Sequence, residues 1–399
     1  MKQDDSFSQI IDRLGTYCTQ WDFVQDRFGE ADLLPFTISD MDFATAPKII
    51  ETLVNRSRHG VFGYSRWQHT DFLNAIQRWF KMRFNSDIQT EEIVYGPSVI
   101  YMVGQLIRQW SEIDDGIVVH TPAYDAFYKT IEGAQRKVLA CPLRYNDEQW
   151  VCDMKQLEEL LALPTTRVML LCSPHNPTGK VWTADELLLM AELCKRHDVR
   201  VISDEIHMDL CWGNDQHIPW SSISRESYAL FTSASKSFNI PALTGAYGII
   251  NDSKSRNAYF HQLKACDGLS SPAIFAVIAH ITAYTECDDW LQQLRHYLFA
   301  NLVYVKARLD AEFPQLHWQL PESTYLAWIN LNPLSIDDAE LQHCLIHQEK
   351  VAIMPGFIYG PEGKGFIRLN VGCPRTKLEI GMDRLIRALK SCQRTQKQS

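Results

Sequence analysis

The sequence has no closely spaced cysteine pair, although it contains eleven cysteines among its 399 residues. No two of them form a C-x-x-C pattern, which is the usual mark of zinc sites and redox centres. The spacing therefore predicts neither a metal site nor a disulfide framework. It is typical of small buried side chains in a reducing compartment, which indicates a cytoplasmic protein with free thiols.

Long apolar runs and clustered basic residues are missing as well. No apolar stretch approaches the roughly 18 residues of a membrane span. The N-terminal run MKQDDSFSQIIDRLG is polar and acidic, unlike a secretory signal. The net charge is -9, and no run of lysines or arginines offers a basic face to nucleic acid. An apolar fraction of 46% with 22% charged residues is typical of a soluble globular protein.

Between residues 93 and 250, short apolar runs alternate with amphipathic ones. The strand-like runs are rich in β-branched residues and are bounded by Gly, Pro, Asp or Ser. They include GIVVHTPAY, RVMLLCSPHNP, VRVISDEIHMDL, YALFTSAS and GAYGII. The run TADELLLMAELCKRHD has helical spacing, and Thr183 with Glu186 forms a capping box at its start. This alternation predicts an α/β fold with a largely parallel sheet and helices on both faces.

The chain length suggests two domains. Residues 288–313 form one long amphipathic pattern that ends before Pro314, and the runs after it indicate strand, helix, strand, helix. We expect a large domain over residues 56–287 and a smaller α+β domain over residues 288–399, with an N-terminal segment, residues 1–55, packed against the smaller one.

Polar residues follow the expected strands at their carboxyl ends, where open α/β sheets bind ligands. Asn176 follows RVMLLCS, Asp204 and His207 follow VRVIS, and Lys236 follows YALFTSAS. Tyr124 follows IVVHTP, and the Gly-Pro-Ser turn after EEIVY opens a helix whose free amides could hold a phosphate. Taken singly, each residue has an ordinary explanation, such as turn chemistry, a helix cap, core packing or an exposed loop. Their shared edge indicates a binding site.

The order of Asn in NPTG, Asp in SDEIH and Lys in SxSK resembles the fold-type I pyridoxal phosphate (PLP) enzymes of the aspartate aminotransferase superfamily. Further segments resemble its cystathionine β-lyase branch: PFTISDMDFATAP, GVFGYSRW, YGPSVIYM, HTPAYDAFY, SPHNPTGKVW, SDEIHMDL, SKSFNIPALTGAYGI and FIRLNVGCPR. The match spans roughly residues 10–390. It implies a large domain with a mainly parallel seven-stranded sheet, and a smaller α+β domain built from the N- and C-terminal segments.

The resemblance implies a role for each matching residue. Lys236 would hold the aldehyde of PLP through its amine and act as general base. Asp204 would pair with the pyridine nitrogen, and Asn176 would bond the phenolic oxygen and contact the substrate. The remaining implied roles are ring stacking by Tyr124, support of Asp204 by His207, binding of the substrate carboxylate by Arg368, and phosphate binding by Ser233, Ser235 and the amides of Val99 and Ile100.

Tyr64, in GYSRW, would by the same resemblance reach the phosphate in the neighbouring subunit's site, which implies a homodimer. Many aminotransferases of the superfamily carry an arginine eight residues after the lysine, whereas this chain has Thr244 there. This departure counts against a plain aminotransferase. It also shifts phosphate binding toward the two serines and Tyr64.

The implied reaction is cleavage of L-cystathionine, or of cystine and related S-substituted cysteines, to a thiol, pyruvate and ammonia. An aminotransferase and a mainly regulatory protein stay open as alternatives, because the Lys–Asp–Asn set alone does not separate β-elimination from transamination. The resemblance further implies a second role as a repressor that binds the transcriptional activator of maltose genes. For an acidic chain, contact with a protein is more plausible than contact with an operator.

Overall fold

The computed structural model describes residues 5–146, 148–213 and 216–396. Its internal contacts divide the chain into two compact units. Unit 1 consists of Met1–Ala44, Pro177–Gly179 and Gln292–Ser399, and unit 2 consists of Thr45–Asn176 and Lys180–Leu291. Compact units defined by contacts need not fold independently. The domain boundaries expected from the sequence therefore stay a prediction.

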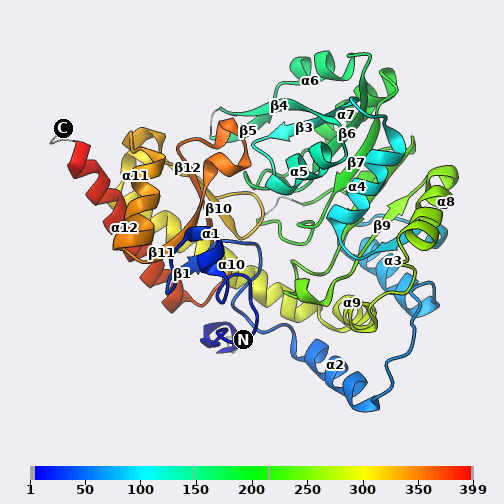
Figure 1. Ribbon diagram of the computed structural model, residues 1–399, viewed down its shortest axis with the longest axis horizontal. Helices are drawn as coiled ribbons and strands as arrows, with labels where there is room; N and C mark the ends of the chain where they lie inside the picture. The colour runs from blue at the N-terminus through cyan, green and yellow to red at the C-terminus, as the bar shows by residue number, and fades with distance from the viewer. Residues whose placement is uncertain (1–4, 147, 214–215, 397–399) are drawn as a thin grey trace. The chain divides into compact units, whose positions relative to one another are not determined.

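Unit 2 contains an eight-stranded sheet in the order β2-β9-β8-β7-β6-β3-β4-β5 (Figure 1). Its strands are β2 (Ile93–Gly96), β3 (Gly116–Thr121), β4 (Lys137–Asn146), β5 (Gln149–Cys152), β6 (Thr166–Cys172), β7 (Arg200–Asp204), β8 (Tyr228–Thr232) and β9 (Ala246–Ile250). Strands β9 and β5 run opposite to the other six strands. The expected mainly parallel sheet is confirmed. It has one strand more than the seven expected, because β5 folds back onto β4 and adds an edge.

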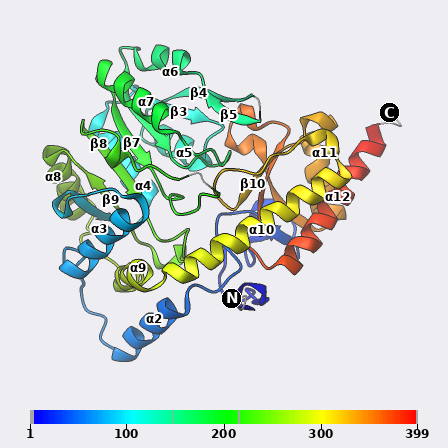
Figure 2. The same cartoon turned by 180° about the vertical axis from the view of Figure 1, so that it is seen from behind.

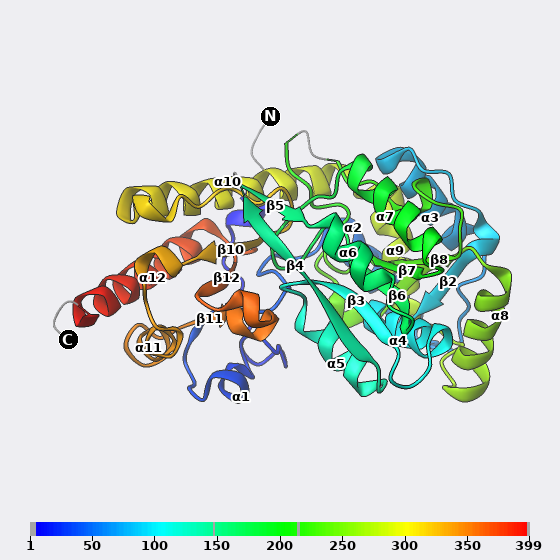
Figure 3. The same cartoon turned by 90° about the horizontal axis from the view of Figure 1, so that it is seen from above.

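Helices cover both faces of this sheet (Figure 3). On one face, α4 (Val99–Trp110), α5 (Asp125–Gly133) and α8 (Ser253–His261) share one apolar core with alternate residues of the strands, such as Val168 and Leu170 of β6. On the other face lie α6 (Met154–Leu161) and α7 (Ala184–Arg196), and Cys194 of α7 contacts Met169 of β6. Successive strand residues point to opposite faces, so β6 is buried on both sides.

Helix α7 begins where the sequence predicts. The Thr183 hydroxyl accepts a hydrogen bond from the Glu186 amide at 3.2 Å, and the Glu186 carboxylate accepts one from the Thr183 amide at 2.9 Å. This reciprocal arrangement satisfies two amides of the first turn. The predicted capping box is therefore confirmed.

A third group of helices in unit 2 packs around the edge of the sheet near β9. It contains α2 (Pro47–His59), α3 (Thr70–Phe84) and α9 (Ile274–Glu286). Phe72 of α3 meets Tyr247 of β9 edge to face, with ring centroids 6.3 Å apart. Across the described ranges of the chain, no helix is both long and apolar enough to cross a membrane.

Unit 1 contains a four-stranded sheet in the order β1-β11-β12-β10. Its strands are β1 (Leu34–Phe36), β10 (Leu326–Asn330), β11 (Val351–Pro355) and β12 (Phe366–Asn370), and its helices include α1 (Val24–Phe28), α11 (Asp338–His343) and α12 (Arg375–Gln396). Strand β1 pairs parallel with β11, so the N-terminal segment completes a sheet of C-terminal strands. The expected smaller α+β part built from both ends of the chain is confirmed.

The long amphipathic pattern forms the single helix α10 (Asp288–Glu312), as predicted. Its C-terminal half lies beside α12 (Figure 2), where Arg308 and Asp383 form an ion pair at 2.8 Å. Lys390 and Glu312 form a second ion pair between the same helices. Because these side chains are partly exposed, the two pairs contribute little to stability compared with the buried leucines of α10.

Candidate functional site

Six strands of the large sheet run in the same direction, and five of them lead into residues of the predicted site. These five are β2, β3, β6, β7 and β8. The predicted residues at or after the ends of these strands are, in the same order, Val99, Tyr124, Asn176, Asp204 and Lys236. The topology therefore places at one edge five residues that are far apart in the sequence, and this edge is where such sheets bind ligands.

Lys236 lies in the loop after β8, and its side chain is half-buried. The next residue fixes this loop, because the Ser237 hydroxyl donates a hydrogen bond to the Asp209 carboxylate at 2.8 Å. Asp209 is itself buried, accepts a hydrogen bond from the Trp79 indole at 3.0 Å and lies 3.7 Å from the Arg83 guanidinium. Sequence reasoning missed Asp209, although it follows Asp204 by five residues in the same acidic segment.

His280 of α9 holds the same loop from another side. Its Nε2 atom accepts a hydrogen bond from the Ala234 amide at 3.2 Å, while Nδ1 lies 2.8 Å from the carbonyl oxygen of Ala276. Burial lowers the pKa of His280 to about 4, so its imidazole is neutral, donates through Nδ1–H and accepts at Nε2. The sequence carried no signal for this residue, which lies inside an apolar helix.

The two serines predicted to bind phosphate differ in their surroundings. Ser233 is buried, and its hydroxyl donates to the Gly245 carbonyl oxygen at 2.7 Å and accepts from the Ser235 amide at 3.1 Å. Ser235 is half-buried. The Ser233 hydroxyl thus has partners within the chain, and phosphate binding by the two serines stays a prediction.

Lowering the pH is expected to destabilise the fold through His280. Between pH 6.5 and pH 4 the unfolded chain binds a proton at this residue and the folded chain does not. The contribution is therefore fully present above pH 6.5 and declines by about 3 kcal/mol as the pH falls to 4. Urea unfolding at pH 7 and at pH 4 measures the difference. His280→Gln, which keeps one donor and one acceptor but does not titrate, should show a smaller difference; an equal difference would contradict this assignment.

Asp204, the last residue of β7, is a buried carboxylate close to Lys236. Burial raises its pKa to about 7, although the Ile206 amide, which donates to it at 3.1 Å, and the Lys236 ammonium pull the pKa down. These two groups compensate only part of the cost of burying the charge. Asp204 would therefore gain from a further cation placed against it.

Asn176 is buried in the turn after β6, next to the strand that ends with Asp204. Its backbone amide contacts the sulfur of Cys172, and Cys172 pairs with Asp204 in the register of β6 and β7. Burial, with a further contribution from the Asp204 charge, raises the pKa of the Cys172 thiol well above its usual value. The structure thus brings Asn176, Asp204 and Lys236 into one neighbourhood; their individual roles stay predictions.

The acidic segment after β7 contains a second buried carboxylate, Glu205, whose partners mark it as structural. It accepts hydrogen bonds from the Ser203 hydroxyl at 2.8 Å and from the Trp220 amide at 2.9 Å, and its other oxygen lies 2.7 Å from Nε2 of His217. His207 is also buried, in the turn that follows. Its predicted support of Asp204 stays a prediction.

Helix α4 begins at Val99, with Ser98 as its cap: the Ser98 hydroxyl accepts a hydrogen bond from the Tyr101 amide at 3.1 Å. The amides of Val99 and Ile100 belong to the first turn, where no preceding helical carbonyl can accept from them. Helix α4 packs on β7 and β8. Free amides at a helix N-terminus can bind an anion, and phosphate binding by the amides of Val99 and Ile100 stays a prediction.

Two aromatic residues of the predicted site have contrasting exposure. Tyr124 is the residue before α5, is partly buried against the core of the large sheet, and has its ring 5.8 Å from that of Phe127. Tyr64 is fully exposed in the single chain, and Val61 and Phe62 beside it are also exposed. Neither ring-stacking by Tyr124 nor contact of Tyr64 with a second subunit is tested by the single chain, so both stay predictions.

Arg368 lies on β12 in unit 1 and is buried. Its guanidinium donates to the carbonyl oxygen of Thr37 at 3.1 Å and lies over the Tyr359 ring, 4.8 Å from the centroid. Its burial shows that Arg368 is not a surface arginine at a strand end. Binding of a carboxylate by Arg368 stays a prediction.

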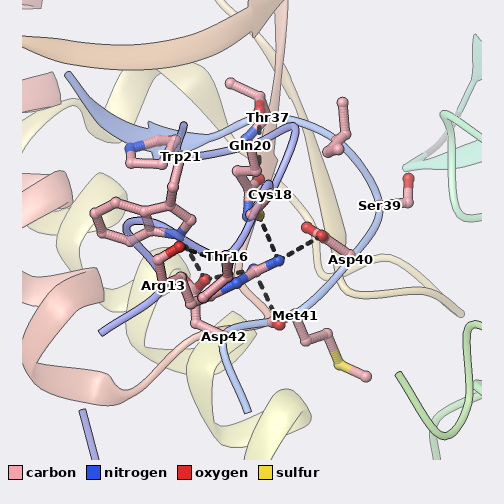
Figure 4. Close-up of polar contacts among 12 residues, drawn as sticks. Arg13, Thr16, Cys18, Gln20, Trp21, Thr37, Ser39, Asp40, Met41 and Asp42 are labelled. Carbon is pink, nitrogen blue, oxygen red and sulfur yellow. Dashed lines mark hydrogen bonds and ion pairs between the residues drawn. The ribbon is translucent and has the colours of Figure 1, made fainter. Parts of the chain in front are cut away.

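The segment that contacts Arg368 is held by a second arginine, Arg13 (Figure 4). Arg13 bonds to Asp40 at 2.7 Å, to Asp42 at 2.8 Å and to the Met41 carbonyl oxygen at 3.2 Å. Burial raises the pKa of Asp42, but Lys377 and Arg13 outweigh this effect and hold the pKa below its usual value. This network fixes residues 40–42 of unit 1, in the same segment as Thr37.

Comparisons with known proteins agree with this arrangement. The family model for aminotransferase class I and II matches residues 31–385. The chain is 63% identical to Protein MalY of Escherichia coli K12 over 385 residues, covering 96% of this chain and 99% of that protein. It is 35% identical to cystathionine β-lyase PatB of Bacillus subtilis, covering 96% and 100%.

Among solved structures, cystalysin from Treponema denticola, whose crystal structure contains a pyridoxal 5′-phosphate cofactor, superposes with a TM-score of 0.92. The two chains are 29% identical, over 96% of this chain and 98% of cystalysin. The unit 2 sheet with its flanking helices and the smaller unit built from both chain ends are those of the fold-type I aminotransferase fold. The chain therefore belongs to the aminotransferase class I and II family.

Proposed function

We propose that the protein is a PLP-dependent carbon–sulfur β-lyase that converts L-cystathionine and water to homocysteine, pyruvate and ammonia. The observation that carries the proposal is the buried Asp204 carboxylate beside the half-buried Lys236 amine at the carboxyl edge of the sheet. The full-length similarity to cystathionine β-lyase PatB supports the choice of reaction. All eleven cysteines are free thiols, which is in keeping with the cytoplasmic location that we also propose.

The residues at this edge suit PLP in their chemistry. A protonated pyridine nitrogen is the cation that would offset the burial of the Asp204 carboxylate. An amine, a buried amide and a helix N-terminus are present for the aldehyde, the phenolic oxygen and the phosphate; these come from Lys236, Asn176 and α4. A chemically complementary group for each polar part of the cofactor supports the proposal.

When bound, PLP supplies an electron-withdrawing ring that stabilises negative charge at the substrate Cα. Lys236 would hold the cofactor covalently before substrate binds, and its freed amine would then take the proton from Cα. The bond between Cβ and sulfur breaks, and the thiolate leaves with the electron pair.

The experiment that tests the proposal separates elimination from transamination. The purified enzyme is mixed with a large excess of L-cystathionine in the absence of any 2-oxo acid. We expect homocysteine and pyruvate in equal amounts over many turnovers. An aminotransferase would stop after one turnover per site and resume when a 2-oxo acid is added, and that result would refute the lyase assignment.

We further propose that Arg368 binds the α-carboxylate of the substrate. Arg368→Lys is expected to raise KM for L-cystathionine about 10- to 100-fold, because a lysine ammonium cannot form the two parallel bonds of a guanidinium. The kcat value should fall less, since binding and not proton transfer is affected. Steady-state kinetics at a series of substrate concentrations measures both. An unchanged KM with a reduced kcat would assign Arg368 a different role.

We propose that the active protein is a homodimer in which Tyr64 reaches the cofactor phosphate of the partner's site. The exposure of Tyr64, Phe62 and Val61 in the single chain supports this proposal, because large apolar side chains grouped on a surface commonly mark an interface. Light scattering gives the molar mass. Mixing Lys236→Ala chains with Tyr64→Ala chains should restore partial activity, since one site of the mixed dimer then has both residues.

A second candidate role is favoured by the 63% identity to Protein MalY. We propose that the protein binds the transcriptional activator of maltose genes and represses them. A protein surface and a cofactor cleft are separate sites, so the two functions are compatible. A maltose reporter strain expressing Lys236→Ala should remain repressed. Loss of repression in that variant alone would tie regulation to catalysis.

A further inference from the structure

Two cysteines and a histidine that have no role in the proposed reaction meet on one face of the large sheet. His120 lies on β3, Cys141 on β4 and Cys152 on β5. The register pairs His120 with Cys141, and Leu143, which shares a face with Cys141, with Cys152. The two sulfur atoms and a ring nitrogen of His120 all lie within 4.8 Å of one another.

The imidazole of His120 is the unusual member of this group. The side chain is only 1% exposed, and neither ring nitrogen has a hydrogen-bond partner within the described residues. Its ring packs against Trp182, with centroids 4.8 Å apart. Leaving a buried polar atom unsatisfied costs about 1–3 kcal/mol, so such a group calls for an explanation. A ligand bound between the imidazole and the two thiols would supply it.

Two other interpretations of the cluster do not account for the buried imidazole of His120. Packing of cysteines as small apolar side chains accounts for Cys141, which is fully buried, but not for an unpartnered imidazole beside it. A disulfide between Cys141 and Cys152 would consume both thiols and still leave His120 without a partner. Only a species that binds nitrogen and sulfur together uses all three groups.

We propose that His120, Cys141 and Cys152 form a binding site for a thiophilic transition-metal ion, represented by Zn²⁺. Two thiolates and one imidazole are a known ligand set for this ion, with a fourth position left for water. Binding would release the two thiol protons to solvent, so that the pair of thiolate charges balances the ion. The ion would tie the edge strands β4 and β5 to β3.

The fold also provides a route to this site. Strand β5 is at the edge of the sheet, and Cys152 is half-buried whereas the other two side chains are buried. An ion can therefore reach Cys152 first and then the two inner ligands. The spacing of the three residues in the sequence, 21 and 11 positions, gives no sign of this arrangement because strand register alone creates it.

The test uses the full-length protein as purified with its cofactor, reduced, treated with chelator and titrated with Zn²⁺ against a metal indicator. We expect one Zn²⁺ per chain for the unaltered protein, and at least a 100-fold weaker affinity for Cys152→Ser. The half-buried position of Cys152 makes this variant tolerable to the fold. Cys266→Ser is the matched control, because Cys266 is exposed and outside the cluster, and it should bind Zn²⁺ like the unaltered protein.

X-ray absorption of the zinc-loaded, unaltered protein identifies the ligands directly. Because it needs no variant, a folding defect cannot affect the result. The proposal predicts two sulfur ligands at about 2.3 Å and nitrogen or oxygen ligands at about 2.0–2.1 Å. Absence of stoichiometric binding would overturn it. So would equal affinity in Cys152→Ser, or loss of binding in Cys344→Ser, since Cys344 and Cys392, with sulfurs 3.5 Å apart, are the competing thiol pair.

Discussion

Replacing Lys236 by alanine is expected to lower kcat for pyruvate release from L-cystathionine by a factor on the order of 10⁴. The variant loses both the amine that holds the cofactor and the base that removes the Cα proton. The fold should survive, because the neighbouring contacts of the loop, Ser237 to Asp209 and Ala234 to His280, do not involve the Lys236 side chain. Pyruvate release is followed with a coupled assay, and circular dichroism checks the fold.

Lys254→Ala is the matched control, because Lys254 is exposed on α8 and takes no part in the site. It should keep the activity of the unaltered enzyme. Activity of Lys236→Ala within tenfold of that control would contradict the assignment of Lys236. Recovery of Lys236→Ala by added small amines would support it, since an external base can replace part of what the side chain supplied.

The second large effect is expected for Asp204→Asn. An asparagine amide has nearly the same shape but no charge, so it cannot hold a proton on the pyridine nitrogen. Truncating one partner of a buried charge pair costs about 2–5 kcal/mol, which corresponds to a loss in kcat of roughly 30- to 5000-fold. The measurement is kcat at saturating cofactor, so that weaker cofactor binding does not lower the measured rate.

Glu205→Gln serves as the comparison, because Glu205 is the adjacent buried carboxylate and bonds only to structural partners. This variant should lower the free energy of unfolding while the folded fraction keeps its kcat. The opposite pattern, with a large loss of kcat in Glu205→Gln and little in Asp204→Asn, would show that the wrong carboxylate has been assigned.

Much of the large sheet could be predicted from the sequence, because its strands are apolar, β-branched and bounded by turn residues. The helix after Thr183 and the long helix from Asp288 were predictable for similar reasons, since both have helical spacing and the first has a capping box. Strands β1, β4, β5 and β11 were not predicted. Strands β1, β5 and β11 have only three to five residues each, and β4, although ten residues long, has an exposed or partly exposed side chain at most of its positions, so its apolar pattern is weak.

The residues of the site that directly follow strands could be predicted from their order in the chain. Asn176, Asp204 and Lys236 follow successive strands, so a shared edge follows from the parallel topology. Asp209 and His280 could not be assigned, because their contacts with the loop depend on how α3 and α9 pack around it. The pairing of Cys141 with His120 likewise depends on strand register, which no spacing rule for cysteines describes.

The most direct test of the central claim, that Lys236 is the residue that holds the cofactor, is chemical trapping. The purified enzyme is reduced with borohydride, digested, and its peptides are weighed by mass spectrometry. We expect a phosphopyridoxyl group on the peptide that contains Lys236, in near-stoichiometric amount. The group on another lysine, or on none, would contradict this account of the protein.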